Sequence, residues 1–290
     1  SDNFPDQTNR NTAAVFFSYK VQLFQKKLNI VTSIREEMVD EKLETPTPAL
    51  GFDWNPKKGL SFKAKLSRNY RSPTFNDLYW EGGFAHGNKD LLAESGWSEE
   101  VGIELQKKIN NYHPSLQINA FNSNINDLIV WLPNDTGVWM PVNKKKVWSR
   151  GIEIQQFNDF SFQKINTGVK LFFTYNPSTL NTGTNQGKQL IYQPVNQAKM
   201  KYYFTYKYWT FDLIYQWFDE RFITEDNSKS LNSYQLINLG IHGDILIKKQ
   251  LFGIHIRVNN LLNEVYQSVE YYATPLRNFQ LSIQYKINQR

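Results

Sequence analysis

The sequence has 290 residues and a formal net charge of +6, and aromatic residues make up 15% of it although its mean hydropathy is only −0.55. The absence of cysteine excludes disulfides, thiolate metal sites and a cysteine nucleophile. The basic residues are dispersed apart from the run Lys144-Lys145-Lys146, so the sequence does not indicate a nucleic-acid partner.

Apolar and polar residues alternate with a period of two in segments along the whole chain. The pattern is clear over 60–67, returns over 100–106 and 252–259, and is cleanest over 279–288. Such alternation places the apolar side chains on one face of a β-strand. It predicts about thirteen strands, many of them near the roughly 9–11 residues of a tilted transmembrane strand, whereas no apolar run approaches the roughly 20 residues of a transmembrane helix. The sequence therefore predicts an all-β protein, an antiparallel transmembrane β-barrel.

Short and long connections alternate between the predicted strands. The short ones lie at 25–27, 55–59, 110–114, 207–208 and 247–250. The long ones lie at about 72–96, 133–146, 176–194, 222–232 and 264–277. Outer-membrane barrels have short turns on the periplasmic side and long loops outside. We therefore expect residues 1–290 to be one portion of such a barrel, in contact with membrane lipids and with five extracellular loops.

The odd number of predicted strands leads to a further expectation. Single-chain bacterial barrels have an even number of strands, and an unpaired strand edge is not tolerated in lipid. The chain would then be the C-terminal part of a larger barrel, with its first strand beginning outside the cell. N-terminal strands or a second chain would complete the barrel.

Two motifs resemble a known family. The first reads Tyr70-Arg71-Ser72-Pro73-Thr74-Phe75-Asn76-Asp77-Leu78-Tyr79-Trp80, followed by Gly87-Asn88-Lys89-Asp90-Leu91 and Glu94. The second reads Val258-Asn259-Asn260-Leu261-Leu262-Asn263-Glu264-Val265-Tyr266, followed by Pro275-Leu276-Arg277-Asn278-Phe279. Together they are similar to the barrel signature of TonB-dependent outer-membrane receptors, with Ser72 where alanine is usual and Lys89 where proline is usual.

The resemblance implies an outer-membrane protein of a Gram-negative bacterium that imports a bulky, scarce nutrient, either a ferric siderophore or cobalamin. In this family a plug domain fills a barrel of 22 strands, and the TonB complex of the inner membrane acts on the plug. The plug is absent from this sequence, so we expect the TonB complex to act through an N-terminal plug that lies outside it.

The segment between the two boxes of the first motif holds the main candidate ligand residues. His86 lies there near Phe84, after Tyr79 and Trp80. Haem-uptake members carry a histidine in this segment, so the resemblance implies that a neutral imidazole nitrogen of His86 could bind haem iron. Haem would then be the cargo, and we expect no resident cofactor or other metal site. Further aromatic or soft residues on long loops that could contact a cargo are Trp139, Met140 and Tyr192.

Other classes of protein remain open from the residues alone. A passive porin would share the loop pattern, and a soluble carbohydrate-binding β-sandwich would share the alternation with its apolar face inward. A barrel protease or phospholipase would need paired acids. The carboxylates considered for that role are Glu100, Glu104, Glu153 and Asp212. Because acids commonly line a polar lumen, we expect the protein not to be an enzyme.

Overall fold

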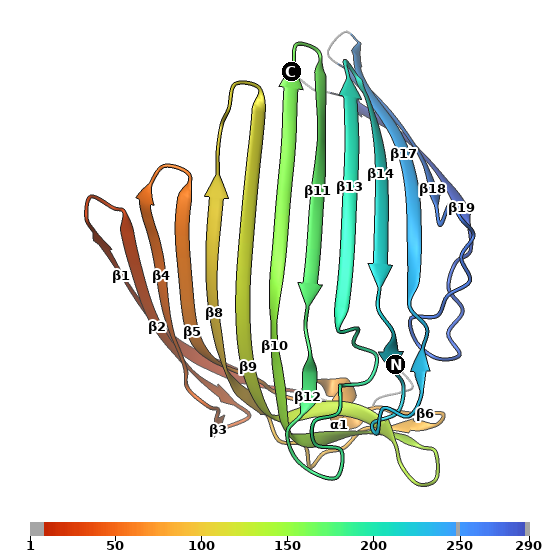
Figure 1. Ribbon diagram of the computed structural model, residues 1–290. Coiled ribbons are helices and arrows are strands. Elements are labelled where there is room, and N and C mark those ends of the chain that lie inside the picture. Colours follow the sequence, from red (N-terminus) through yellow and green to blue (C-terminus); the bar gives the residue numbers. More distant parts are fainter. Residues whose placement is uncertain (1–8, 248–249, 288–290) are drawn as a thin grey trace. The chain divides into compact units, whose positions relative to one another are not determined.

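The computed structural model describes residues 9–247 and 250–287 and confirms an antiparallel all-β architecture (Figure 1). Thirteen strands of this described part have ten residues or more, as the alternation predicts. They are β1 (Thr12–Leu23), β2 (Leu28–Val39), β4 (Thr47–Lys57), β5 (Leu60–Arg71), β8 (Glu94–Gln106), β9 (Tyr112–Pro133), β10 (Trp139–Phe162), β11 (Ile165–Tyr175), β13 (Asn196–Tyr206), β14 (Trp209–Phe218), β17 (Tyr234–Ile247), β18 (Gln250–Asn259) and β19 (Asn278–Ile287).

Short elements occupy the connections. They are β3 (Lys42–Leu43), α1 (Phe75–Tyr79), β6 (Glu81–Gly82), β7 (Ala85–His86), β12 (Ser178–Leu180), β15 (Arg221–Phe222) and β16 (Ser230–Leu231). Within the described part of the chain, α1 is the one helix, and no helix there is long and apolar enough to cross a membrane.

The chain divides into two compact units. The first comprises the described residues up to Gly102 together with Ala120–Arg150 and Ser178–Lys188. In it, β1 pairs with β2, β2 with β4 and β4 with β5, always antiparallel. The second unit comprises Ile103–Asn119, Gly151–Pro177 and the described residues from Gln189 onward. There the antiparallel order is β11, β13, β14, β17, β18, β19, so each long strand pairs with the next along the chain.

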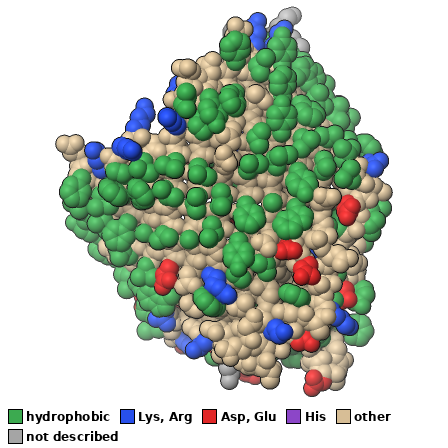
Figure 2. All heavy atoms as spheres, in the orientation of Figure 1, with side chains coloured by type: hydrophobic (Ala, Val, Ile, Leu, Met, Phe, Trp, Pro, Cys, Tyr) green, Lys and Arg blue, Asp and Glu red, His purple; other side chains and the backbone are tan. Residues whose placement is uncertain are grey.

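The apolar faces of the strands are exposed. Val15 and Phe17 on β1 are 75% and 62% exposed, and Leu281 and Ile283 on β19 are 65% and 75% exposed. Hydrophobic side chains cover much of the face drawn in Figure 2, and the acidic side chains visible there lie mostly in its lower part. A soluble β-sandwich would bury these faces against a second sheet, so their exposure contradicts that alternative. It is the distribution required of strands that face lipid.

Tight turns close most hairpins at one end of the strands. Gln163 and Lys207 begin two-residue turns with φ of 50° and 54°, the left-handed backbone that such turns require. Gly59, with φ of 80°, has the same role between β4 and β5. The predicted turn at 247–250 includes residues 248–249, which lie outside the described residues.

The observed long connections are 72–93, 176–195, 219–233 and 260–277. The prediction of a long loop at 133–146 is wrong, because this segment is mostly strand and only residues 134–138 connect β9 to β10. The backbone N–H of Trp139 donates to the carbonyl of Phe84 over 2.7 Å, so contact with the 72–93 loop extends the strand beyond the predicted limit.

Asn260 stabilises the turn after β18. Its side-chain oxygen accepts from the backbone N–H of Glu264 and its side-chain nitrogen donates to the carbonyl of Glu264, both over 2.8 Å. Asn260 is itself left-handed, with φ of 51°. The second family motif is therefore a turn-forming device at this point, because asparagine tolerates that backbone and caps it.

Candidate functional site

The 72–93 loop begins with a helix of one turn that the residues after β5 specify. Pro73 cannot donate to a β-ladder, and β5 ends at Arg71. Thr74 then caps α1: its hydroxyl accepts from the backbone N–H of Asp77 over 3.2 Å, and Asp77 accepts from the backbone N–H of Thr74 over 2.9 Å. This reciprocal pair is a capping box. It fixes the direction in which the loop leaves the strand.

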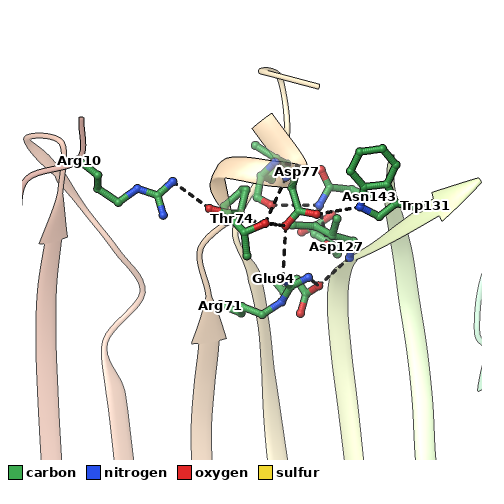
Figure 3. Close-up of polar contacts among 11 residues, drawn as sticks. Arg10, Arg71, Thr74, Asp77, Glu94, Asp127, Trp131 and Asn143 are labelled. Carbon is green, nitrogen blue, oxygen red and sulfur yellow. Dashed lines mark hydrogen bonds and ion pairs between the residues drawn. The ribbon is translucent and has the colours of Figure 1, made fainter. Parts of the chain in front are cut away.

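Asp77 is the anchor of the loop. Its carboxylate is buried and accepts from the indole N–H of Trp131 on β9 over 2.9 Å, and Arg71 lies 3.5 Å away (Figure 3). Arg71 also pairs with Glu94, the first residue of β8, whose carboxylate accepts from the backbone N–H of Ile129 over 2.8 Å. The loop base is therefore bonded to three strands.

The electrostatics of Asp77 follow from these contacts. Burial alone would raise the pKa of its carboxyl group. The hydrogen bonds from Thr74 and Trp131 and the charge of Arg71 outweigh burial and hold the pKa below the ordinary value of 3.8. Asp77 is thus a buried carboxylate that is kept ionised to hold the loop, which is a structural role.

The returning part of the loop is bonded to β10. Asn88 donates its backbone N–H to the carbonyl of Asp77 over 2.8 Å and its side-chain N–H to the carbonyl of Pro141 over 3.1 Å. Asn143 holds the backbone of Leu92 from both sides, donating to its carbonyl and accepting from its N–H. A Cβ at Gly87 would lie 2.6 Å from backbone atoms of Leu78 and Tyr79, so only glycine allows the close approach there.

The hairpin of β6 and β7 carries the main candidate residues. Gly83, with φ of 56°, turns the hairpin, and Phe84 beside it is 82% exposed. The Nδ1 atom of His86 lies 2.9 Å from a carboxylate oxygen of Glu81. Trp139, 40% exposed, pairs in parallel with Ala85. The structure therefore brings Trp139, more than fifty residues away in sequence, next to the segment of Phe84 and His86 in the first unit.

The other candidate residues have different surroundings. Tyr79 and Trp80 are partly buried at the end of α1, with the Nζ atom of Lys89 5.6 Å from the centre of the Tyr79 ring. Met140 lies in β10 and its sulfur is 4.0 Å from the side-chain nitrogen of Asn134. Tyr192 belongs to the second unit, where its backbone N–H donates to the carbonyl of Phe222. Burial foremost, and then the charge of Glu270, raise the pKa of Tyr192.

The second unit holds a polar cluster on its strands, defined by Asp212, His242, His255 and Arg257. The two imidazole rings stack with centroids 5.3 Å apart, and buried Asp212 pairs with Arg257 over 3.3 Å. Among the described residues, no group of three or more histidine or acidic side chains could hold a metal ion. Asp212, considered above for catalysis, is therefore a partner of an arginine on the polar face of the sheet.

Sequence reasoning missed the residues that hold the site. Trp131 has the pattern of an aromatic at a membrane interface, yet its N–H donates to Asp77, 54 residues away. Asn143 lies in a segment that the sequence predicts to be a loop, but its side chain bonds the backbone of Leu92. One local signal was present, because Thr74 and Asp77 have the spacing of a capping box.

Acid should loosen this loop before the strands. Since the pKa of Asp77 is lowered in the folded protein, the stability that its ionised form contributes is complete above its ordinary pKa of 3.8 and is lost as the pH falls from there through the lower folded value. We expect the hydrogen-exchange protection of the Leu78 and Asn88 amides to fall in that range while amides of β11 stay protected. Equal loss of protection in both places would contradict a local role for Asp77.

The chain is similar to proteins of known family. Residues 1–261 match the family model described as TonB dependent receptor-like, beta-barrel. The chain is 23% identical over 265 residues to the vitamin B12 transporter BtuB of Photobacterium profundum, which covers 88% of this chain and 40% of that protein. It is 36% identical over 133 residues to a BtuB of Vibrio vulnificus, which covers 44% of this chain and 20% of that protein. The chain thus spans less than half the length of these relatives.

Solved structures share the fold. BauA, the ferric preacinetobactin receptor of Acinetobacter baumannii, matches with a TM-score of 0.66 at 15% identity, over 95% of this chain and 43% of that one. A mutant of the ferric enterobactin receptor PfeA of Pseudomonas aeruginosa matches with a TM-score of 0.71 at 15% identity, over 94% of this chain and 44% of that one. At this level of identity the likeness concerns the fold alone.

Proposed function

This chain belongs to the family of TonB-dependent receptor β-barrels, and on that premise we propose that it forms part of a receptor that imports cobalamin or a ferric siderophore by TonB-coupled transport. Proteins of this family lie in the outer membrane of Gram-negative bacteria, and this chain shares that location. Family membership also favours transport over catalysis and energised import over passive diffusion through a porin.

The proposal rests on exposed aromatic side chains that the anchored 72–93 loop holds in place. Phe84 is 82% exposed on a hairpin whose backbone is bonded to Trp139, and Asp77 fixes the base of the same loop. A large exposed aromatic side chain on an anchored loop loses little conformational entropy when it binds a ligand. Phe84 and Trp139 therefore suit a bulky cargo with apolar surface, and we assign them to the first contact with it.

A specific contact supports haem as the alternative cargo. The carboxylate of Glu81 lies 2.9 Å from Nδ1 of His86, and the side chain of His86 is 46% exposed. A carboxylate that accepts from one ring nitrogen fixes the tautomer and makes the other nitrogen a better metal ligand. Under this reading Nε2 of His86 would bind haem iron, with Glu81 as its positioning residue.

A titration with three probes tests these assignments. The full-length protein in detergent is titrated with cyanocobalamin, ferric enterobactin and haemin, following absorbance and tryptophan fluorescence. We expect one of the first two to bind saturably, and Phe84→Ala and Trp139→Ala to weaken it about 10-fold or more, since each removes an aromatic anchor. Trp97→Ala is the matched control, because Trp97 is equally exposed, at 43%, but lies on β8.

Binding of the three probes and uptake by cells distinguish the cargo classes and test the coupling to TonB. Haemin binding that shifts the Soret band and is lost in His86→Ala would replace cobalamin and siderophore with haem as the cargo. Binding of none of the three probes would contradict the proposed cargo class. Uptake by cells of the bound probe should stop with a protonophore, and uptake that continues unchanged would refute TonB coupling.

A further inference from the structure

A second site is present in the first unit, at the ends of four strands. A cavity of about 400 Å³ lies where β1 begins, β2 ends, β4 begins and β5 ends, next to the start of the 72–93 loop. This volume is within the range of small-molecule sites. We call it the Arg10 cavity, and the lining residues that matter here are Arg10, Thr12, Arg35, Glu37, Tyr70 and Ser72.

Most strand residues that line the Arg10 cavity belong to the face opposite the exposed apolar one. Thr12 pairs directly with Val39, and Arg35 with Thr47, so these lining residues share one face. Phe17 pairs with Ile34 on the other face, where both side chains are exposed. Because side chains alternate along a strand, the lining residues of β1, β2 and β4 point away from the apolar face.

The lining is rich in hydrogen-bond donors. Its charged side chains are Arg10, Arg35 and Glu37, and the carboxylate of Asp40, outside the lining, lies 3.9 Å from Nε of Arg10. Glu37 is already engaged, because Arg35 donates to it from two nitrogens over 2.9 and 2.7 Å and the Tyr70 hydroxyl also bonds it. An anion entering the cavity would therefore meet a carboxylate whose charge Arg35 neutralises.

Two buried donors in the lining have no acceptor among the described residues. They are the Nε–H of Arg10 and the hydroxyl of Ser72. Arg10 donates from another nitrogen to the carbonyl of Pro73 over 2.8 Å, and its Nε is 3.9 Å from Asp40, too far for a hydrogen bond. A buried donor without an acceptor costs about 1–3 kcal/mol, so a ligand that supplied acceptors to both donors would remove this cost at each.

We propose that the Arg10 cavity binds a phosphate group, either as the free ion or as part of a phosphate ester. A guanidinium fork and hydroxyl groups from separate segments of the chain can each reach a different oxygen of a tetrahedral oxyanion. The residues of this site are separate from Phe84, His86 and Trp139, so the inference does not depend on the cargo proposed above.

Calorimetric titration of the full-length protein in detergent tests this site, with inorganic phosphate and glycerol 3-phosphate as probes in a buffer free of other oxyanions. We expect saturable binding that Arg10→Gln weakens about 10- to 100-fold, through loss of a charge-assisted hydrogen bond. Arg10→Lys should also weaken it, since lysine keeps the charge but not the fork. Arg277→Gln removes the same charge from an exposed residue outside the lining and should bind as wild type.

The two probes separate the sources of the phosphate group. Binding of inorganic phosphate assigns the site to the free ion, and binding of the ester alone assigns it to a phosphorylated molecule. No saturable binding of either probe, or equal binding by Arg10→Gln and wild type, overturns the proposal. If Arg10→Gln loses heat-modifiable migration and so does not fold, Ser72→Ala decides, because it removes one buried donor without changing charge and should weaken binding severalfold.

Discussion

Replacing Asp77 with alanine should destabilise the folded 72–93 loop by about 2–4 kcal/mol, because it removes the charged acceptor of several buried donors. The donors that lose this acceptor are the backbone N–H and the hydroxyl of Thr74 and the indole N–H of Trp131. The ion pair with Arg71 adds less, since the two groups are 3.5 Å apart and Arg71 is half exposed. Cargo affinity should fall with the loop, as Phe84 would no longer be held.

Hydrogen exchange of the Leu78 and Asn88 amides measures this loss locally. Asp77→Asn is the informative partner, because its one side-chain oxygen can still accept from Trp131, whereas an amide nitrogen replaces the oxygen that accepts from Thr74 and the charge is lost; its effect should lie between wild type and Asp77→Ala. Asp135→Ala, at an exposed position in the short 134–138 turn, serves as the control and should change neither protection nor binding. Unchanged protection in Asp77→Ala would mean that the capping residues and Asn143 hold the loop without it.

The strands could be predicted from the sequence because their faces differ in polarity, and a period of two appears wherever one face meets lipid. The same reasoning wrongly predicted a loop at 133–146, where the side chains no longer alternate between lipid and the polar face. Pro141 and the three lysines that follow Asn143 are unusual within a strand. The strand continues there because Trp139 and Asn143 bond the 72–93 loop, which no local pattern reveals.

The exposed residues of the candidate site could be placed in a long loop from the sequence, but the contacts that hold this loop could not be predicted. Phe84 and His86 stand in the segment between two recognisable boxes, so their position in a long loop followed from the sequence. The partners that fix this loop are remote: Trp131 is 54 residues from Asp77, and Asn143 is 51 residues from Leu92. Such contacts depend on strand register, which the alternation does not determine beyond the choice of face.

An arginine in place of Val101 should destabilise the barrel by about 2–4 kcal/mol, the cost of placing a cation near the middle of the membrane on the lipid face. Val101 is 59% exposed and lies near the middle of β8, between Trp97 and Gln106. Ile103→Arg, on the same face two residues nearer the tight turn, should have a similar or smaller effect, since the cost falls toward the interface.

Glu100→Arg is the matched control, because Glu100 is the neighbour of Val101 in sequence and therefore points to the opposite face of the same strand. It introduces the same side chain at the same depth but into polar surroundings, so its effect should stay below about 1 kcal/mol. Urea unfolding in lipid vesicles, followed by tryptophan fluorescence, measures both. If the two variants were equally destabilised, the alternation on β8 would not separate lipid from lumen, and the facing of the residues that line the Arg10 cavity, inferred from the same alternation on β1 and β2, would lose its basis.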